Sequence, residues 1–250
     1  MLHRRGSRTP FDAIACRVPN RIARAIVITG FVVALLAGCA FEVTRNVPAL
    51  LLAIDGDVST SPPTEALVEN THLQPPSSII TAGNGRADLS LVPGVLIQLE
   101  ADSELQLMSL QLTKNGNRIG EAMRRDVLIS LRRGALHGVV QFETELSPVR
   151  ISTRDGMVVV LAPALFRVET RDAKTRVTCA RGSLRFEPNS GAPMTLEGEA
   201  FCEWPSDHAE SMPAQFDVLA SNEIENLREV ERKLLGLQDR SRLAPYPWRQ

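Results

Sequence analysis

The sequence of 250 residues is poor in aromatic residues, which make up 4% of it: eight Phe, two Trp and one Tyr. A core built around large rings is therefore excluded, and Val, Leu, Ile and Ala must fill the interior. The sequence also lacks an excess of charge, since its formal net charge is −1. Residues 1–38 hold six arginines and one acid, so the remainder carries 22 basic and 28 acidic residues, a net charge of −6. An acidic chain of this kind argues against nucleic acid as a partner.

Motifs of the common catalytic and cofactor sites are missing as well. There is no G-x-S-x-G nucleophile elbow, no P-loop and no G-x-G-x-x-G fingerprint. His72, His137 and His208 are widely separated, and none lies at metal-ligand spacing, so we expect neither metal nor cofactor. Glu143 and Glu145 could serve as the acid and base of a hydrolase if they share one strand face. We favour a solvated strand face, and we predict no catalytic residues and no enzyme.

The N-terminus has the pattern of an export signal. An arginine-rich stretch ends at Arg24, and residues 25–38 follow without a charge, as in the n-region and h-region of a signal peptide. The run ends in Leu36-Ala37-Gly38-Cys39, which resembles the lipobox of bacterial lipoproteins. The resemblance implies that Cys39 is diacylated and becomes the mature N-terminus.

This resemblance implies a lipid-anchored protein of the cell envelope. Cys39 would hold the chain to a membrane, facing the periplasm or the cell surface, and Ala40 in place of Asp after the Cys favours the outer membrane. The alternative is an uncleaved membrane helix over 25–41, which is at the short end of what spans a bilayer. In both cases the remainder leaves the cytoplasm, because the positive charges precede the apolar run.

Cys179 and Cys202 would be the only cysteines of the mature chain. In an oxidising compartment they could form a disulfide, and closing a loop of about 24 residues would stabilise the fold by roughly 3 kcal/mol. The alternative is two small apolar side chains buried on neighbouring strands. Neither cysteine has a further ligand at metal-binding spacing, so a metal site is not expected.

Short alternating segments fill the body of the chain. Apolar and polar residues alternate in 87–91, 95–99 and 105–112, which is the period of β-strands with one buried face. Further strands are expected at 127–131, 139–142, 149–151, 157–161, 166–170, 176–179, 184–186, 194–196 and 199–204. Many short strands separated by Gly-containing turns, without a long helical pattern between them, predict an all-β sandwich, barrel or β-roll.

Several of these segments resemble the FecR domain family. Residues 78–99 match its opening of an I-x-T-G-like turn and two strands, and Asp102-Ser103-Glu104-Leu105 matches the motif that follows. Residues 149–156 resemble the family's i-x-T-P-x-G turn, with Arg154 at the usual Pro, and 175–184 resemble its next strand. The resemblance implies a FecR-like β-sandwich or β-roll in the periplasm. The best-known member relays the occupancy of an outer-membrane receptor to a sigma-factor regulator.

A helical period marks the C-terminal segment. Its apolar residues recur at three- and four-residue steps: Ile224, Leu227, Val230, Leu234 and Leu237. They predict one amphipathic helix over 223–235, with a capping box at Asn222 and Glu225 and an end at Gly236. Its apolar stripe either packs on the parent domain or binds a partner.

The expected organisation combines these parts. It consists of a signal peptide (1–38), a tether with one entering strand (39–66), a FecR-like β domain (67–216), a helix (217–238) and an extended tail (239–250). The basic cluster of Arg124-Arg125 and Arg132-Arg133 could bind an anionic glycan or lipid headgroup, although interleaved acids favour a solvated edge.

The expected function is a non-enzymatic envelope lipoprotein that binds or senses an envelope protein or glycan, with no cofactor. The alternative is an envelope polysaccharide or peptidoglycan hydrolase with an unconventional carboxylate site.

Overall fold

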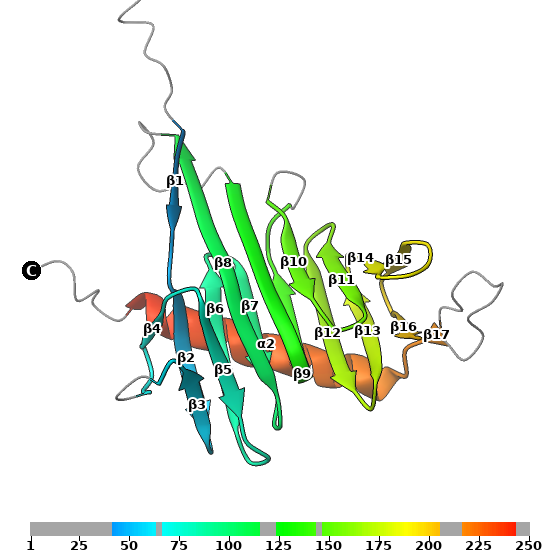
Figure 1. The fold of residues 1–250 in the computed structure, drawn as a ribbon, viewed down its shortest axis with the longest axis horizontal. Coiled ribbons are helices and arrows are strands. Elements are labelled where there is room, and N and C mark those ends of the chain that lie inside the picture. Colours follow the sequence, from blue (N-terminus) through cyan, green and yellow to red (C-terminus); the bar gives the residue numbers. More distant parts are fainter. Residues whose placement is uncertain (1–41, 64–66, 116–123, 144–146, 206–216, 244–250) are drawn as a thin grey trace, which may run out of the picture. The chain divides into compact units, whose positions relative to one another are not determined.

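Strands dominate the structure, a computed structural model that describes residues 42–63, 67–115, 124–143, 147–205 and 217–243. The first strands are β1 (Glu42–Asn46), β2 (Ala49–Asp55), β3 (Val58–Ser61), β4 (His72–Leu73), β5 (Ser77–Thr81), β6 (Arg86–Val92), β7 (Val95–Leu99), β8 (Glu104–Asn115) and β9 (Arg124–Val140). They are followed by β10 (Val149–Ser152), β11 (Gly156–Val160), β12 (Ala164–Arg171), β13 (Lys174–Arg181), β14 (Ser183–Pro188), β15 (Met194–Glu197), β16 (Ala200–Trp204), β17 (Asp217–Val218) and helix α2 (Ser221–Leu243). Figure 1 shows their arrangement.

Two sheets pack against each other and share β9. The first half of β9 pairs with β8 and lies parallel to β10 in sheet A, which also contains β1, β3, β5, β11, β14 and β15. The second half pairs with β7 and β12 in sheet B, which also contains β2, β4, β6, β13, β16 and β17. The prediction of an all-β sandwich of many short strands with one C-terminal helix is confirmed.

The strand β9 changes sheets at Gly134. This residue has φ of +84°, and a Cβ built on it would lie 2.5 Å from the Cα atom of Ser103. Only glycine adopts this conformation without strain and also allows so close an approach. Gly134 therefore fixes the point at which β9 leaves sheet A, and two strands predicted separately, 127–131 and 139–142, form one long strand.

The core between the sheets is aliphatic, as the aromatic-poor composition predicts. Phe166 and Phe186 are the largest fully buried side chains, and Leu and Ile account for the next largest. Strand β7 is buried along its whole length. Val95, Ile97 and Leu99 face the core between the sheets, whereas Leu96 faces α2.

Helix α2 packs on the outer face of sheet B. Leu227 and Leu234 are fully buried against Leu52, Leu96 and Leu165 of that sheet, and Figure 1 shows the helix running across the strands. Three ion pairs join the helix to the sheet: Glu223 with Arg176 at 3.1 Å, Glu231 with Arg181 at 2.5 Å, and Lys233 with Asp88 at 2.9 Å. The apolar stripe therefore packs on the parent domain.

The ends of α2 differ from the prediction. Its first turn is closed by the carbonyl of Ala220, which accepts hydrogen bonds from the backbone N–H groups of Glu223 and Ile224, so Asn222 lies inside the helix instead of capping it. The helix also continues through Gly236 to Leu243. A glycine inside a helix costs only about 1 kcal/mol, and the helix that continues beyond it packs Leu237 against the cluster of Leu227 and Leu234.

Gly236→Ala should stabilise the protein. Gly236 is exposed, and an added Cβ would meet nothing within 4 Å. Alanine reduces the backbone freedom of the unfolded chain, so we expect the free energy of unfolding to rise by about 0.5–1 kcal/mol. Urea denaturation measures the change, and an unchanged or lower midpoint would contradict a helix that is continuous at this position.

The segment expected to be a tether contributes three strands. The apolar run 49–54 forms most of β2, which pairs with β4 and β6, and Ala49 and Leu51 of this strand are fully buried. Residues 58–61 form β3 on the edge of sheet A. The compact unit therefore begins at Glu42, not at residue 67, because burial of β2 completes the core.

Candidate functional site

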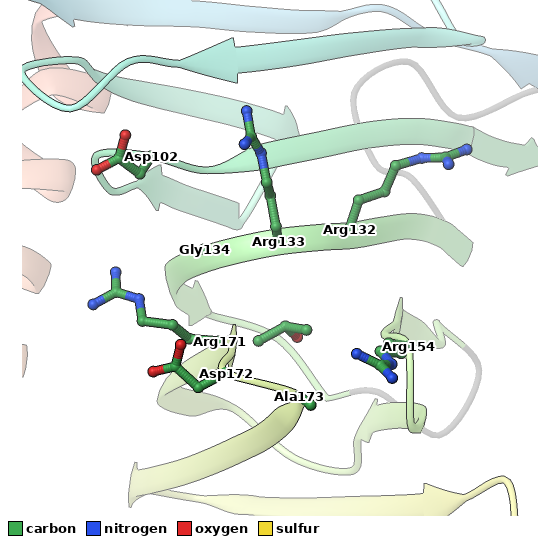
Figure 2. Close-up of a pocket in the computed structure, with 9 residues that line it drawn as sticks. Asp102, Arg132, Arg133, Gly134, Arg154, Arg171, Asp172 and Ala173 are labelled. Carbon is green, nitrogen blue, oxygen red and sulfur yellow. The ribbon is translucent and has the colours of Figure 1, made fainter.

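A cleft of about 320 Å³ opens beside the point where β9 changes sheets. Figure 2 shows that its lining comes from the turn before β8, from β9, from the turn between β10 and β11, and from the hairpin of β12 and β13. The lining residues are Asp102, Arg132, Arg133, Gly134, Arg154, Thr170, Arg171, Asp172 and Ala173. Four arginines against two aspartates make it a cationic site.

The turn that carries Asp102 is held by buried hydroxyl groups. The Thr81 hydroxyl donates to the carbonyl of Glu100 at 2.5 Å and accepts from the N–H of Ser103 at 2.9 Å. The Ser103 hydroxyl in turn accepts from the N–H of Ala135 at 2.9 Å. Thr81 and Ser103 belong to the two opening FecR-like motifs, so these motifs join β5, the turn and β9 into one wall of the cleft.

The turn that carries Arg154 is fixed in a similar way. The Thr153 hydroxyl accepts from the N–H groups of Asp155 and Gly156 at 3.3 and 3.2 Å, and the Asp155 carboxylate accepts from the Thr175 hydroxyl at 2.7 Å. These bonds tie the turn to β13. Arg154, where the family pattern has Pro, thereby presents a cation on a rigid turn.

The arginines of the cleft are only weakly neutralised. The Nε atoms of Arg132 and Arg133 lie 3.7 and 3.9 Å from the two oxygens of one carboxylate, that of Glu104, and Arg171 lies 3.5 Å from Glu169. Such long, exposed pairs contribute little. Within the described residues, the Arg154 guanidinium has no hydrogen-bond or ion-pair partner. Figure 2 shows the four guanidiniums spread around the cleft, so they suit an extended anionic ligand.

A second hollow of about 440 Å³ adjoins the cleft and shares Asp102 and Arg133 with it. Its other walls are the turn between β2 and β3, residues 56–59, and the end of β5 with the residues that follow, 80–83. Arg133 therefore stands where the two hollows meet. A chain-like ligand could extend from one hollow into the other past this residue.

A half-buried charge network lies near the end of β7. Glu100 accepts from Arg167 Nε at 2.8 Å and is hydrogen-bonded to His137 Nε2, while Arg167 also donates to Glu169 at 2.5 Å. Burial alone would raise the pKa of Glu100, but the hydrogen bonds and charges of His137 and Arg167 outweigh it and hold that pKa well below its usual range. For Arg167 the effect of burial has the opposite sign and would lower the pKa, but the hydrogen bonds and charges of Glu100 and Glu169 raise it. The network contributes to the stability of the fold.

The two cysteines lie on neighbouring strands as free, buried thiols. Cys202 of β16 is opposite Val177, two residues before Cys179 on β13. Such diagonal neighbours have Cα atoms roughly 7–8 Å apart, whereas a disulfide spans about 4.4–6.8 Å. Burial raises the pKa of Cys179 to about 11 and that of Cys202 to about 12, so both thiols stay protonated at neutral pH.

Other candidates from the sequence are separated or undescribed. The lipobox Leu36-Ala37-Gly38-Cys39, His208 and Glu145 lie outside the described residues. Glu143 does not lie on a strand, because β9 ends at Val140. The basic cluster is divided: Arg132 and Arg133 line the cleft, whereas Arg124 and Arg125 begin β9 far along the strand.

The described ranges contain no group of three or more His, Cys, Asp or Glu side chains placed to hold a metal ion. No helix within them is long and apolar enough to cross a membrane.

The contribution of Arg154 and Arg171 to the cleft was missed in the sequence. They are 22 and 39 residues beyond Arg132, and only the fold brings them to the same place. The sequence did contain one indication of Arg154. This arginine occupies the position at which the FecR-like turn over 149–156 usually has Pro, so the turn carries a cationic side chain instead of a proline ring.

Comparisons with known proteins agree with the turn motifs. Residues 77–185 match the family described as FecR protein, and this range includes all four arginines of the cleft. Two crystal structures, at 1.65 and 2.50 Å resolution, of a candidate anti-sigma factor from Parabacteroides distasonis ATCC 8503 are similar, at 15% identity and with TM-scores of 0.44 and 0.43. The match covers 59% of this chain and 62% of each of those chains. No curated protein matches the chain.

Proposed function

We propose that this chain is a non-enzymatic lipoprotein of the bacterial cell envelope whose FecR-like domain is a binding or sensing module in envelope signalling. The family match over residues 77–185 supports the signalling role, and the lipobox at Cys39 supports the anchor. The observation that carries the proposal is the arginine cleft, because two of the turns that line it, at 102–105 and 149–156, have the FecR-like motifs.

The cleft suits recognition of an anionic partner. Guanidinium groups bind carboxylates and phosphates through paired, charge-assisted hydrogen bonds. Among the described residues nothing competes for the Arg154 guanidinium, and Arg133 and Arg171 can exchange long internal contacts for shorter ones to a ligand. Arg132 has a long contact to Glu104 and donates to the uncharged Gln106 at 2.8 Å, so its charge is also available to an anion. The partner we propose is an envelope protein or glycan that presents several carboxylates or phosphates along an extended segment.

Arg154→Gln should weaken binding of an anionic chain. We expect the full chain to bind a pentaglutamate peptide or a tetragalacturonate oligosaccharide with an affinity that falls as salt is added, because the contacts are ionic. Loss of one charge-assisted contact of about 1.5–3 kcal/mol should reduce that affinity roughly tenfold or more. Isothermal titration calorimetry measures both effects.

Arg232→Gln is the matched control, since Arg232 is an exposed arginine of α2 whose ion-pair partner among the described residues is Glu225 of the same helix. It should bind each probe as the unchanged protein does. Equal losses in the two variants, or binding that does not respond to salt, would reject the cleft as the recognition site.

Acylation of Cys39 is tested in cells. Feeding a labelled fatty acid should mark the protein, and Cys39→Ser should abolish both the label and the cleavage after Gly38. Two or three acyl chains should give stable anchoring, since a single chain binds a membrane only marginally. A cleaved, labelled protein in the Cys39→Ser variant would refute the anchor. Fractionation of the membranes then tests placement in the outer membrane.

A further inference from the structure

An apolar groove of about 500 Å³ lies at the opposite end of β8 from the arginine cleft. Seven apolar residues line it: Val47, Pro48, Leu50, Leu91, Val92, Pro93 and Leu112. The polar residues of the lining are His72, Ser90 and Lys114. Its volume lies in the range of about 300–1,000 Å³ found for small-molecule sites, and its lining suits a hydrocarbon ligand with one charged end.

Three cationic side chains lie on the face of sheet A that lines the groove. In the strand register, Leu112 of β8 is opposite Arg45 of β1 and Arg125 of β9, and Lys114 is opposite Val43. Paired residues of adjacent strands share a face, so all of them lie on the face to which Leu112 and Lys114 belong. We call this face the ledge: Val43, Arg45, Leu112, Lys114 and Arg125. It carries three cations and no acid, while Glu42 and Asp126 fall on the opposite face.

The cations of the ledge lack anionic partners. Within the described residues, Arg45, Lys114 and Arg125 take part in no ion pair, whereas nearby Arg150 pairs with Asp126 at 2.8 Å. Arg125 stacks on the ring of Phe142 at 4.4 Å from its centroid, and its Nε atom is buried without a hydrogen-bond partner. Burial lowers the pKa of Arg125. A partly desolvated, unpaired guanidinium beside an apolar groove would gain from a bound anion.

We infer that the groove and the ledge bind an anionic phospholipid of the membrane. An acyl chain occupies the groove, and the headgroup phosphate is held by Arg45, Lys114 and Arg125. This inference rests on the proposed envelope anchor for its source of lipid. Val47 of the groove is eight positions after Cys39, a distance of at most about 29 Å in an extended chain, so an anchored protein holds the groove within reach of the bilayer surface.

Photocrosslinking in cells tests this site on the full chain. A photoreactive phenylalanine analogue is placed at Leu112, the cells are grown with radioactive phosphate, and the protein is purified in denaturant after irradiation. We expect a phosphate-labelled adduct. The same analogue at Gln111, which faces the other side of β8 and bonds to Asn46, should give little adduct. With the analogue at Leu112, Arg45→Gln combined with Lys114→Gln should reduce the yield several-fold.

Three outcomes would overturn the inference: no labelled adduct at Leu112, an equal yield at Gln111, or an adduct that carries fatty acid without phosphate. The last result would mean that the protein's own acyl anchor fills the groove, because that anchor contains no phosphorus. Equal protein levels and protease resistance show that each variant folds. The anchor is judged separately: if Cys39 carries no fatty acid but Leu112 still crosslinks to phospholipid, the lipid site stands and the proposed acylation fails.

Discussion

Replacing Leu227 and Leu234 together by alanine should lower the free energy of unfolding by about 6 kcal/mol, since each fully buried leucine costs roughly 2–5 kcal/mol when it is truncated. Both side chains are completely inaccessible between α2 and sheet B. The residues are two helical turns apart, so their effects should nearly add. For a protein of this size the melting temperature should fall by about 12–24 °C. Calorimetry or circular dichroism measures it.

Glu229→Ala provides the control for this experiment, because Glu229 lies on the exposed side of α2. It should change stability by no more than about 0.5 kcal/mol. If the double variant melts like the unchanged protein but no longer binds an envelope partner, α2 is an interaction surface and its packing on sheet B is incidental.

The strands could be predicted from the sequence because the pattern of apolar and polar residues within each segment indicates a strand. Residues 95–99 and 105–112 alternate or run apolar between turn residues, and they form β7 and most of β8. Local periodicity reports which face of a strand is buried. It does not report which strands are neighbours, and the sharing of β9 between two sheets depends on Gly134, whose positive φ no periodicity reveals.

The errors at the two ends of the domain have one physical cause. Pro and Ser residues at 59–64 indicated a tether, and Gly236 indicated a helix end. In both places tertiary packing outweighed the local signal, because Leu51 and Leu237 pack against apolar residues distant in sequence. Local preferences of about 1 kcal/mol are smaller than the gain from burying one aliphatic side chain.

For a related reason, only two of the four arginines of the cleft could be recognised in the sequence. Arg132 and Arg133 are adjacent and formed part of a recognised basic cluster, but Arg154 and Arg171 join them only through the pairing of β9 with β12 and of β10 with β9. Arg125 lies seven residues before Arg132 on β9, opposite Leu112 of the groove, and so does not reach the cleft. One cluster in the sequence thus becomes two sites of different chemistry, one polar and one largely apolar.

Glu100→Gln should lower the free energy of unfolding by about 2–3 kcal/mol at pH 7, the value of hydrogen bonds to a charged group left partly unsatisfied. Glu100 is the shared acceptor of Arg167 and His137 in the half-buried network. Glutamine keeps the size of the side chain but removes its charge, so Arg167 retains only Glu169. Urea denaturation at pH 7 measures the loss, and Glu225→Gln, at an exposed carboxylate of α2, should leave stability nearly unchanged.

The same variant tests how the free energy of unfolding depends on pH. The folded protein holds the pKa of Glu100 well below its ordinary value of 4.5, so the unfolded chain takes up the proton first as the pH falls. The contribution of Glu100 is therefore complete above about pH 5 and declines as the pH drops through 4.5 toward the folded-state pKa. Glutamine has no such titration, so the stability difference between the protein and Glu100→Gln should shrink between pH 5 and pH 3. A difference that stays constant over this range would show that Glu100 contributes through packing instead of charge.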